Sequence, residues 1–224
     1  MVNQPYDEIP ALKEALSRGD CLNGLARDFP PPERAVTGAG RHPAVFLDRD
    51  GTLNRDKGYV YRWADWEWLP GAPEALAGLK EAGYKLVVIT NQAGVAKGYY
   101  REEAVLELHR QVNLDLAGHR PAAALDAFYH CPHHPDYSGP CSCRKPAPGL
   151  IIRAAAEHGL DLARSFLVGD KLSDAAAGRA AGCRALLVLT GHGRFEAAGA
   201  PPDLAVAEDL AAAARLILAA GLNT

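Results

Sequence analysis

The chain has 224 residues, which at about 150 residues per domain favours one large domain with a sizeable core. Its formal net charge is −3, so it lacks the basic excess of proteins that bind nucleic acid or anionic membranes nonspecifically. Hydrophobic residues make up 48% and charged residues 23%, which excludes wholesale disorder, collagen and coiled coil. Partners are therefore expected to be small or specific.

The N-terminal sequence argues against export. Residues 1–19 place acidic side chains and a proline where a secretory signal would place basic and then apolar residues, and nothing resembles a transmembrane span. Three of the five cysteines crowd into residues 131–143, which suits thiolate ligands better than a disulfide framework. We therefore expect a cytoplasmic protein, monomeric, that binds neither membranes nor nucleic acid.

Short apolar runs alternate along the chain with segments of helical length and period. Apolar runs of four or five residues are typical of strands buried on both faces. The alternation predicts an α/β fold of three layers, Rossmann-like, in which a mostly parallel central sheet has helices on both sides. The predicted strands are 44–47, 86–89, 127–129, 166–168, 185–189 and 204–206, and the predicted helices are 72–82, 101–117, 149–158, 172–181 and 210–220.

Two segments depart from this alternation. Residues 1–41 read as an N-terminal arm with a short helix over 10–18, which leaves residues 42–224 as a single domain. Residues 131–148 form an irregular loop. Only 40 positions separate Asp50 from Thr90 and 55 separate Thr90 from Lys145, too few to insert a cap domain. We therefore predict a capless fold with an open site.

Two aspartates follow the first predicted strand directly, in the sequence DRDGTLN from Asp48 to Asn54. The ligand crevice of an open parallel sheet lies beyond the carboxyl ends of its strands, so both carboxylates are expected there. Asp48 can attack phosphorus, while Asp50 gives a proton to the leaving oxygen and later takes one from water. The alternative interpretation of the motif alone is a solvated Asp-Gly turn.

Polar residues also follow the second strand. Thr90 and Asn91 can bind phosphoryl oxygens through a hydroxyl and an amide, although such a pair alone would equally suit a helix cap or an Asx turn. Lys145 could balance nearby carboxylates and hold the transferring phosphoryl group, and Arg144 could add bidentate contacts. By itself an Arg-Lys pair is more often an exposed loop.

A third aspartate follows the fourth predicted strand. Asp48, Asp170 and the backbone carbonyl of Asp50 would then form a hard oxygen site for Mg²⁺. The ion would screen the negative charges of the nucleophile and the phosphate. Asp174 could touch a metal-bound water or complement the dipole of the following helix, and the sequence leaves both open.

The loop after the third strand has the spacing of a zinc site. A Cys-x-His pair and a Cys-x-Cys pair lie seven residues apart, which gives the three thiolates and one imidazole of a closed tetrahedral site. Such Zn²⁺ would be structural, holding the loop beside Arg144 and Lys145. The alternative is a set of free thiols, and His134 could replace His133. The proposed ligands are Cys131, His133, Cys141 and Cys143.

Four segments together resemble the four motifs of the haloacid dehalogenase (HAD) superfamily, in order. An acid at Asp50, two residues after the nucleophile, is similar to the phosphatases and mutases of that superfamily, whereas its ion-pumping ATPases carry threonine there. The resemblance therefore implies hydrolysis or mutase chemistry. The segments are DRDGTLN (48–54), VVITNQAG (87–94), CRKPAPG (143–149) and FLVGDKLSD (166–174).

The zinc loop followed by CRKP, with GYV at 58–60, resembles the family of heptose-1,7-bisphosphate 7-phosphatases and histidinol-phosphate phosphatases. This resemblance implies removal of the 7-phosphate from a heptose bisphosphate, on the way to activated heptose for lipopolysaccharide or surface glycans. Ala93 departs from the family, whose members often carry serine there. The substrate-binding positions it implies are Asp56, Lys57, Gly58, Tyr59, Thr90, Asn91, Gln92, Ala93, Arg144, Lys145 and Lys171.

Two other functions compete with this one. The same chemistry could act on histidinol phosphate or another small phosphorylated metabolite. A zinc-stabilised binding module without catalysis is the alternative from a different class, but Asp48, Asp50, Lys145 and Asp170 are all present. We therefore expect a Mg²⁺-dependent phosphatase that uses an aspartyl-phosphate intermediate.

Overall fold

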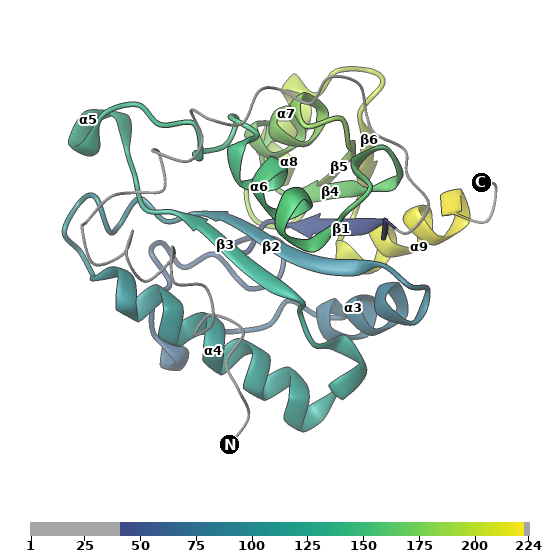
Figure 1. Ribbon diagram of the computed structural model, residues 1–224, viewed down its shortest axis with the longest axis horizontal. Helices are drawn as coiled ribbons and strands as arrows, with labels where there is room; N and C mark the ends of the chain where they lie inside the picture. The colour runs from purple at the N-terminus through teal and green to yellow at the C-terminus, as the bar shows by residue number, and fades with distance from the viewer. Residues whose placement is uncertain (1–40, 222–224) are drawn as a thin grey trace. The chain divides into compact units, whose positions relative to one another are not determined.

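A computed structural model describes residues 41–221 of the chain (Figure 1). The expected arm and its helix over 10–18 lie outside the described residues, apart from Arg41. Six strands form one parallel sheet in the order β3-β2-β1-β4-β5-β6. They are β1 Ala44–Leu47, β2 Lys85–Asn91, β3 Ala127–Cys131, β4 Phe166–Gly169, β5 Arg184–Val188 and β6 Ala205–Ala207.

Helices cover both faces of the sheet, so the predicted three-layer α/β fold is confirmed (Figure 1). None of the helices within residues 41–221 combines the length and apolar character needed to cross a bilayer. One face carries α3 Ala72–Glu81, α4 Glu102–His119 and α9 Leu210–Gly221, and the other carries α6 Gly149–His158 and α7 Leu172–Ala180. The short elements are α5 Pro135–Ser138, α8 Gly193–Glu196, η1 Trp63–Asp65, η2 Pro121–Ala123, η3 Leu162–Arg164 and η4 Ala197–Gly199.

The central strand β1 is buried on both faces, which explains its unbroken apolar run. Successive side chains of a strand point to opposite faces. Val45 and Leu47 accordingly pack in the core formed with α3, α4 and α9, whereas Ala44 and Phe46 pack in the core formed with α6 and α7. All four side chains are completely inaccessible to solvent.

Strands β2 and β3 continue beyond the apolar runs that predicted them. Thr90 pairs with His130 and Asn91 with Cys131, so each strand is two residues longer than expected at this end. Parallel pairing satisfies backbone N–H and C=O groups whatever the polarity of the side chains. A prediction from hydrophobicity alone therefore ends these two strands too early. The single turns α5 and α8 were also not predicted, because four residues are too few to show a helical period.

The strand order brings three carboxyl ends together. Strand β1 lies between β2 and β4, so residues that follow these three strands meet at one edge of the sheet. The segments after β1 and β3, residues 51–71 and 132–148, contain only a 3₁₀ turn and a four-residue helix respectively in the described chain. The capless architecture is therefore confirmed, and loops alone surround this edge.

Candidate active site

Three buried aspartates and one lysine form the centre of the carboxyl edge. Asp48 follows β1, Asp170 follows β4, and Asp174 lies in the first turn of α7. One oxygen from each carboxylate lies within 4.8 Å of the others. Lys145 Nζ lies 2.7 Å from Asp48 Oδ1 and 2.7 Å from Asp174 Oδ1, and donates to the carbonyl oxygen of Ile89 at 2.6 Å. All three hydrogens of the buried ammonium are thus occupied.

Burial and mutual repulsion shift the pKa values of this cluster. Burial raises the pKa of Asp170 to about 7, and neighbouring Asp48 adds to the shift while Lys171 opposes it. Burial also raises the pKa of Asp174 to about 6, against the opposing effect of Lys145. Burial alone would lower the pKa of Lys145, but Asp174 and Asp48 raise it above its ordinary value. The cluster therefore keeps its ammonium charged and resists carrying three carboxylate charges at once.

The donor set fits a hard divalent cation such as Mg²⁺. Asp170 Oδ1 is buried without a hydrogen bond in the described chain, although Lys171 Nζ lies 3.7 Å away. Carboxylate oxygens in such a group are ligands that Mg²⁺ accepts. Two glycines make room for this side chain, since a Cβ at Gly51 or Gly191 would lie 2.3 Å or 2.2 Å from Asp170 Oδ2. The cluster could therefore hold Mg²⁺ between Asp48 and Asp170.

Asp174 combines a structural and an electrostatic contact, where the sequence left its role open. Its Oδ2 accepts a hydrogen bond from the backbone N–H of Lys171 at 3.0 Å, which caps the first turn of α7. Its Oδ1 forms the ion pair with Lys145. Asp174 thus supplies the third carboxylate of the cluster, and metal binding through the Asp50 carbonyl stays a prediction.

The carboxylate of Asp50 is held by three side chains. Arg49 Nη2 donates to Oδ2 at 2.8 Å, Gln92 Nε2 donates to Oδ2 at 3.0 Å, and Asn54 Nδ2 donates to Oδ1 at 3.0 Å. Arg49 is completely buried, whereas the Asp50 side chain keeps 18% of its surface exposed. Asp50 is therefore fixed in orientation yet open to a ligand, which suits a residue that exchanges protons.

Gln92 links Asp50 to the end of β2. Its Oε1 accepts the O–H of buried Tyr100 at 2.9 Å, and its Nε2 donates to Thr90 Oγ1 at 2.8 Å. Because Thr90 accepts this bond, its own hydroxyl hydrogen can be donated to another acceptor, and a phosphoryl oxygen in that role stays a prediction. The turn over Ala93 and Gly94 leaves no space here, since a Cβ at Gly94 would lie 2.2 Å from the Tyr100 ring.

The side chain of Asn91 positions Lys145. Its Nδ2 donates to the backbone oxygen of Lys145, and its Oδ1 accepts the backbone N–H of Lys145, both at 3.1 Å. Sequence reasoning assigned Asn91 to the phosphate, and that contact stays a prediction. The two bonds to the Lys145 backbone could not be inferred from the sequence, because the residues lie 54 positions apart.

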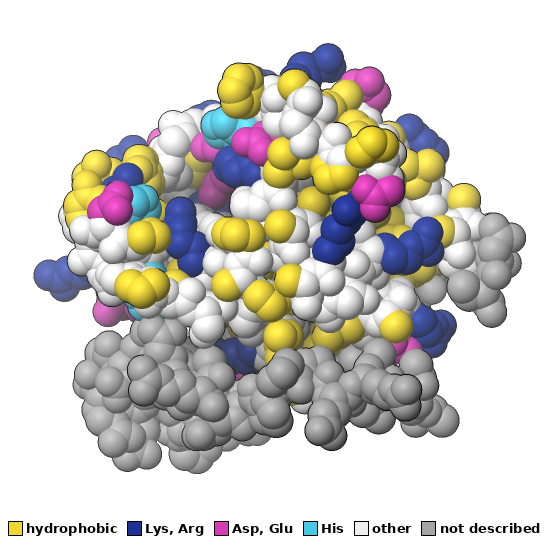
Figure 2. Space-filling view, turned by 90° about the horizontal axis from the view of Figure 1, so that it is seen from above, with side chains coloured by type: hydrophobic (Ala, Val, Ile, Leu, Met, Phe, Trp, Pro, Cys, Tyr) yellow, Lys and Arg dark blue, Asp and Glu magenta, His cyan; other side chains and the backbone are white. Residues whose placement is uncertain are grey.

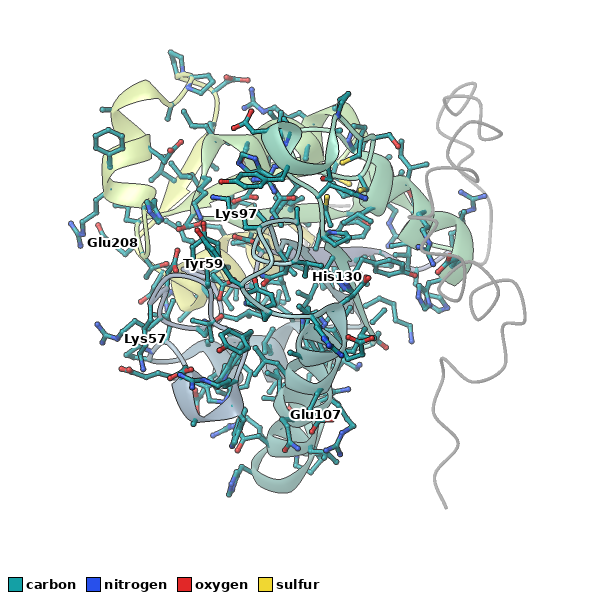
Figure 3. The ribbon with its side chains drawn as sticks, turned by 90° about the vertical axis from the view of Figure 1, so that its left-hand side faces the viewer. Lys57, Tyr59, Lys97, Glu107, His130 and Glu208 are labelled. Atoms are coloured by element: carbon teal, nitrogen blue, oxygen red, sulfur yellow. The ribbon has the colours of Figure 1, made fainter. Side chains whose placement is uncertain are left out.

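The residues after Asn54 form a loop near the cluster. Asp56 Oδ1 accepts the backbone N–H of Gly58 at 2.9 Å, which closes an Asx turn. Lys57 forms an exposed ion pair with Glu67 at 3.0 Å. Tyr59 lies beside Lys97 at the carboxyl edge, which faces the viewer in Figure 3. The substrate contacts assigned to Asp56, Lys57, Gly58 and Tyr59 stay predictions.

The loop after β5 also borders the carboxylate cluster. The backbone N–H of His192 donates to Asp170 Oδ2 at 2.8 Å, and its ring lies 3.7 Å from Asp56 Oδ2. Lys171 Nζ also faces Asp56, at 3.9 Å. Figure 2 shows acidic, basic and histidine side chains gathered around a hollow on the face that carries α6 and α7. Sequence reasoning missed His192, although polar residues follow β5 as they follow β1, β2 and β4.

Four side chains of the loop after β3 form a metal-binding constellation. The sulfur atoms of Cys131 and Cys143 lie 3.2 Å apart, and those of Cys143 and Cys141 lie 3.3 Å apart. A tetrahedron with Zn–S bonds of about 2.3 Å has edges of about 3.8 Å, so a small expansion would accommodate Zn²⁺. The four residues whose ligand atoms lie within 4.8 Å of one another are Cys131, His133, Cys141 and Cys143.

The structure separates the two neighbouring histidines. His133 Nδ1 lies 3.3 Å from Cys143 Sγ, within the constellation. His134 instead caps α5, where its Nδ1 accepts the backbone N–H of Asp136 at 3.3 Å. Arg144 Nη1 donates to the backbone oxygen of His133 at 3.1 Å, which ties this cation to the same loop. The geometry therefore favours His133 as the fourth ligand.

Comparison with known proteins identifies the family. A HAD-hydrolase-like family model matches residues 142–213. D-glycero-β-D-manno-heptose-1,7-bisphosphate 7-phosphatase of Photorhabdus laumondii is 47% identical over 137 residues, which cover 59% of this chain and 72% of that protein. D-glycero-D-manno-heptose-1,7-bisphosphate 7-phosphatase of Thermosynechococcus vestitus is 42% identical over 188 residues, covering 78% of this chain and 95% of that protein. The chain belongs to this family of HAD phosphatases.

Solved structures agree with this assignment. The crystal structure of D,D-heptose 1,7-bisphosphate phosphatase from B. bronchiseptica, complexed with magnesium and phosphate, superposes on this HAD phosphatase with a TM-score of 0.72 and 38% identity. The match covers 80% of this chain and 99% of that chain. A putative HAD-like phosphatase from Mesorhizobium loti gives a TM-score of 0.68 at 33% identity, covering 86% of this chain and 87% of that chain. The resemblance read from the four motifs is thus confirmed.

The raised pKa of Asp170 predicts that Mg²⁺ stabilises this phosphatase more at high pH. With a pKa of about 7 when folded, against 3.8 for an unperturbed aspartate, the metal-free folded protein holds a proton that the unfolded chain has lost. Its free energy of unfolding therefore falls as the pH rises from about 4 to about 7. Mg²⁺ needs the ionised carboxylate, so the increase in Tm that it causes should be larger near pH 8 than near pH 5.5.

Thermal unfolding with and without millimolar Mg²⁺ at the two pH values measures this difference. Asp170→Asn should remove most of it, whereas Asp203→Asn should not, because Asp203 is exposed and pairs with Arg179. Equal increases in Tm at both pH values in the wild type would contradict the prediction.

The two histidines give a matched test of the zinc constellation. His133→Ala should lower Zn²⁺ affinity by more than the 10- to 100-fold typical of losing an outer-shell contact, because a ligand itself is removed. His134→Ala should leave the affinity nearly unchanged. Competition titration of the purified full chain with a zinc-binding dye measures both, and a greater loss in the His134 variant would refute the ligand assignment.

Proposed function

We propose that this chain is a Mg²⁺-dependent phosphatase that removes the 7-phosphate of D-glycero-D-manno-heptose 1,7-bisphosphate through an aspartyl phosphate on Asp48. The observation that carries the chemistry is the position of Asp48, paired with Lys145 beside Asp170 and next to the separately held Asp50. The substrate is supported by the heptose-1,7-bisphosphate 7-phosphatases that this chain resembles at 42–47% identity.

The first step transfers the phosphoryl group to the protein. A carboxylate oxygen of Asp48 forms a bond to the 7-phosphorus, and the bond between that phosphorus and the sugar oxygen breaks. The sugar oxygen leaves with the electron pair and takes a proton from the carboxyl group of Asp50, so that the heptose 1-phosphate departs as an alcohol. The positive charge of Lys145 would stabilise the phosphoryl oxygens during this transfer, and the hydroxyl of Thr90 would donate a hydrogen bond to one of them.

The second step hydrolyses the aspartyl phosphate and regenerates the Asp48 carboxylate. Asp50, now a carboxylate, takes a proton from water while the water oxygen forms a bond to the phosphorus. The bond between phosphorus and the Asp48 oxygen breaks, which restores the Asp48 carboxylate and the Asp50 acid and releases inorganic phosphate. The hydrogen bonds from Arg49, Asn54 and Gln92 keep the same carboxyl group in place for both proton transfers.

Two metals complete the proposal. Bound between Asp48 and Asp170, Mg²⁺ would supply positive charge against the nucleophile and the phosphate. Asp170 Oδ1, which is buried and forms no hydrogen bond within residues 41–221, supports this site. Zn²⁺ held by three thiolates and His133 would have a closed shell and a structural role, which is to order the loop that carries Arg144 and Lys145.

The proposed enzyme works as a cytoplasmic monomer on a small phosphorylated sugar, without nucleic-acid or membrane partners. Three neighbouring thiols that serve as metal ligands suit a reducing compartment. The proposal takes the enzyme to be monomeric. Light scattering coupled to size-exclusion chromatography tests the oligomeric state.

Asp48→Asn should lower kcat by roughly 10³-fold or more, because an amide cannot serve as the nucleophile. The folded structure should persist, since the two side chains have nearly the same shape. Phosphate release measures the activity, while near-ultraviolet circular dichroism and zinc content check the fold. Asp203→Asn is the matched control and should retain full activity. Near-normal turnover by Asp48→Asn would refute the mechanism.

The substrate assignment predicts that kcat/KM for heptose 1,7-bisphosphate exceeds that for histidinol phosphate by about 100-fold or more. Both values are measured by phosphate release with Mg²⁺ present. A higher value for histidinol phosphate would replace the heptose substrate while keeping the chemistry. Absence of phosphate release from either compound would instead favour a non-catalytic binding module.

A further inference from the structure

Residues 190–196, which follow β5 and include α8, contact two sides of the carboxylate cluster, and we call them the β5 segment. The Thr190 hydroxyl donates to the backbone oxygen of Gly51 at 2.6 Å. The backbone N–H of His192, two residues further on, donates to Asp170 Oδ2 at 2.8 Å. The β5 segment is thus bonded both to the residue that follows Asp50 and to Asp170.

The β5 segment is itself held at several points. The backbone N–H of Gly193 donates to the backbone oxygen of Thr190 at 2.8 Å, which closes a tight turn. A Cβ at Gly193 would overlap the backbone oxygen of Val188, so the turn packs directly on the end of β5. At the other end of the segment, Glu196 Oε2 accepts the backbone N–H of Leu172 at 3.0 Å. The segment is therefore fixed between β5 and the first turn of α7.

The backbone carbonyl of Asp50, a predicted ligand of Mg²⁺, has its direction fixed by a hydrogen bond of the same peptide. It shares this trans peptide with the N–H of Gly51, and the two groups of such a planar unit point in opposite directions. The Gly51 N–H donates to the backbone oxygen of Asn54 at 2.8 Å. Gly51 has a φ of +85° and no Cβ, so hydrogen bonds rather than side-chain sterics must hold its backbone.

Thr190 holds the next peptide, between Gly51 and Thr52. Its 2.6 Å bond to the carbonyl of that peptide is shorter than the 3.3 Å bond from the Thr52 N–H to the backbone oxygen of Arg49. Gly51 thus has a hydrogen-bonded peptide on either side. If the Thr190 bond were removed, the longer bond would mainly limit rotation at Gly51, and the Asp50 carbonyl would turn with that rotation.

The β5 segment also determines which oxygen of Asp170 is left for a cation. Oδ2 accepts the His192 N–H, whereas Oδ1 is buried and forms no hydrogen bond within residues 41–221. A Cβ at Gly191 would lie 2.7 Å from the Cα of Gly51, so the turns after β1 and β5 touch beside this carboxylate. The same segment therefore positions Gly51 and Asp170.

Mg²⁺ would make the spacing of these groups important, because it requires oxygen ligands at about 2.0–2.1 Å in near-octahedral geometry. Asp50 follows β1 and Asp170 follows β4, so their separation beyond the strand ends depends on contacts between loops. The β5 segment supplies such contacts to both. Groups that orient metal ligands in this way typically contribute about 10- to 100-fold to metal affinity.

We propose that Thr190 is a positioning residue for the Mg²⁺ site. This inference rests on the proposed function, because it takes the Asp50 carbonyl and Asp170 as ligands of the ion. The Thr190 hydroxyl fixes the Gly51 backbone, and the same turn fixes Asp170 through His192. The two ligands thereby keep the separation that the ion requires. Thr190 acts through these residues and is not itself a ligand.

Thr190→Val tests this role, since it removes the hydroxyl and keeps the shape of the side chain. It should raise the Kd for Mg²⁺ by about 10- to 100-fold, measured by isothermal titration of the full chain without substrate. The Mg²⁺ concentration for half-maximal phosphate release should rise by a similar factor, while kcat at saturating Mg²⁺ stays within about threefold of the wild-type value. Thr190→Ser keeps the hydroxyl and should retain the wild-type Kd within about threefold.

Thr52→Val is the matched control, because Thr52 is also buried and its Oγ1 forms no hydrogen bond within residues 41–221. It should leave the Kd for Mg²⁺ unchanged. An unchanged Kd in Thr190→Val, even with a lower Tm, would refute the positioning role while the proposed function stands, as would an equal increase in Thr52→Val. Thr190→Ala provides the same comparison if Thr190→Val does not fold.

The wild-type enzyme separates this inference from the proposed function. If it neither binds Mg²⁺ nor needs Mg²⁺ for phosphate release, the proposed function is wrong, and the role of Thr190 with it. Binding of Mg²⁺ by the wild type with a raised Kd in Thr190→Val alone is the expected result.

Discussion

The ion pairs of Lys145 organise the whole carboxyl edge. Removing an ammonium and a carboxylate from water is costly unless their geometry and hydrogen bonding are good. Here the ammonium meets Asp48, Asp174 and a strand carbonyl at 2.6–2.7 Å, and Asn91 fixes its backbone. One such group therefore ties the ends of β1 and β2 to α7. Two ammonium groups, Lys145 and the more distant Lys171 at 3.7 Å from Asp170, still face three carboxylates, and a divalent cation would correct this imbalance.

Much of the fold could be predicted from the sequence, because short apolar runs and helical periods show which side chains are buried. The chemistry at strand ends could be inferred for the same reason, since strand order brings Asp48, Thr90 and Asp170 to one edge. Contacts made across loops could not be predicted from the sequence. The Asn91 amide bonds to the Lys145 backbone, and Lys97 meets Tyr59 across 38 positions, yet neither contact leaves a periodic signal.

The loop after β3 links the end of the sheet to Lys145. Cys131 ends β3 and pairs with Asn91 in β2, while Cys143 lies two residues before Lys145. A metal held by these cysteines would therefore connect the last residues of two strands with the Lys145 ammonium. Zn²⁺ bound by these four side chains would add to the packing of Cys131, Cys141 and Cys143 against the core, and would help so short a segment to hold Arg144 and Lys145 in place.

Gly51 and Gly191 carry no functional group, yet they restrict how this protein can change over generations. A methyl group at either position would overlap the Asp170 carboxylate. Gly51 also has a φ of +85°, which other residues rarely adopt. A side chain at either glycine would therefore have to displace the Asp170 carboxylate, and a change at the other glycine would not remove that overlap. The space left by these two glycines is thus as much a part of the carboxylate cluster as the acids themselves.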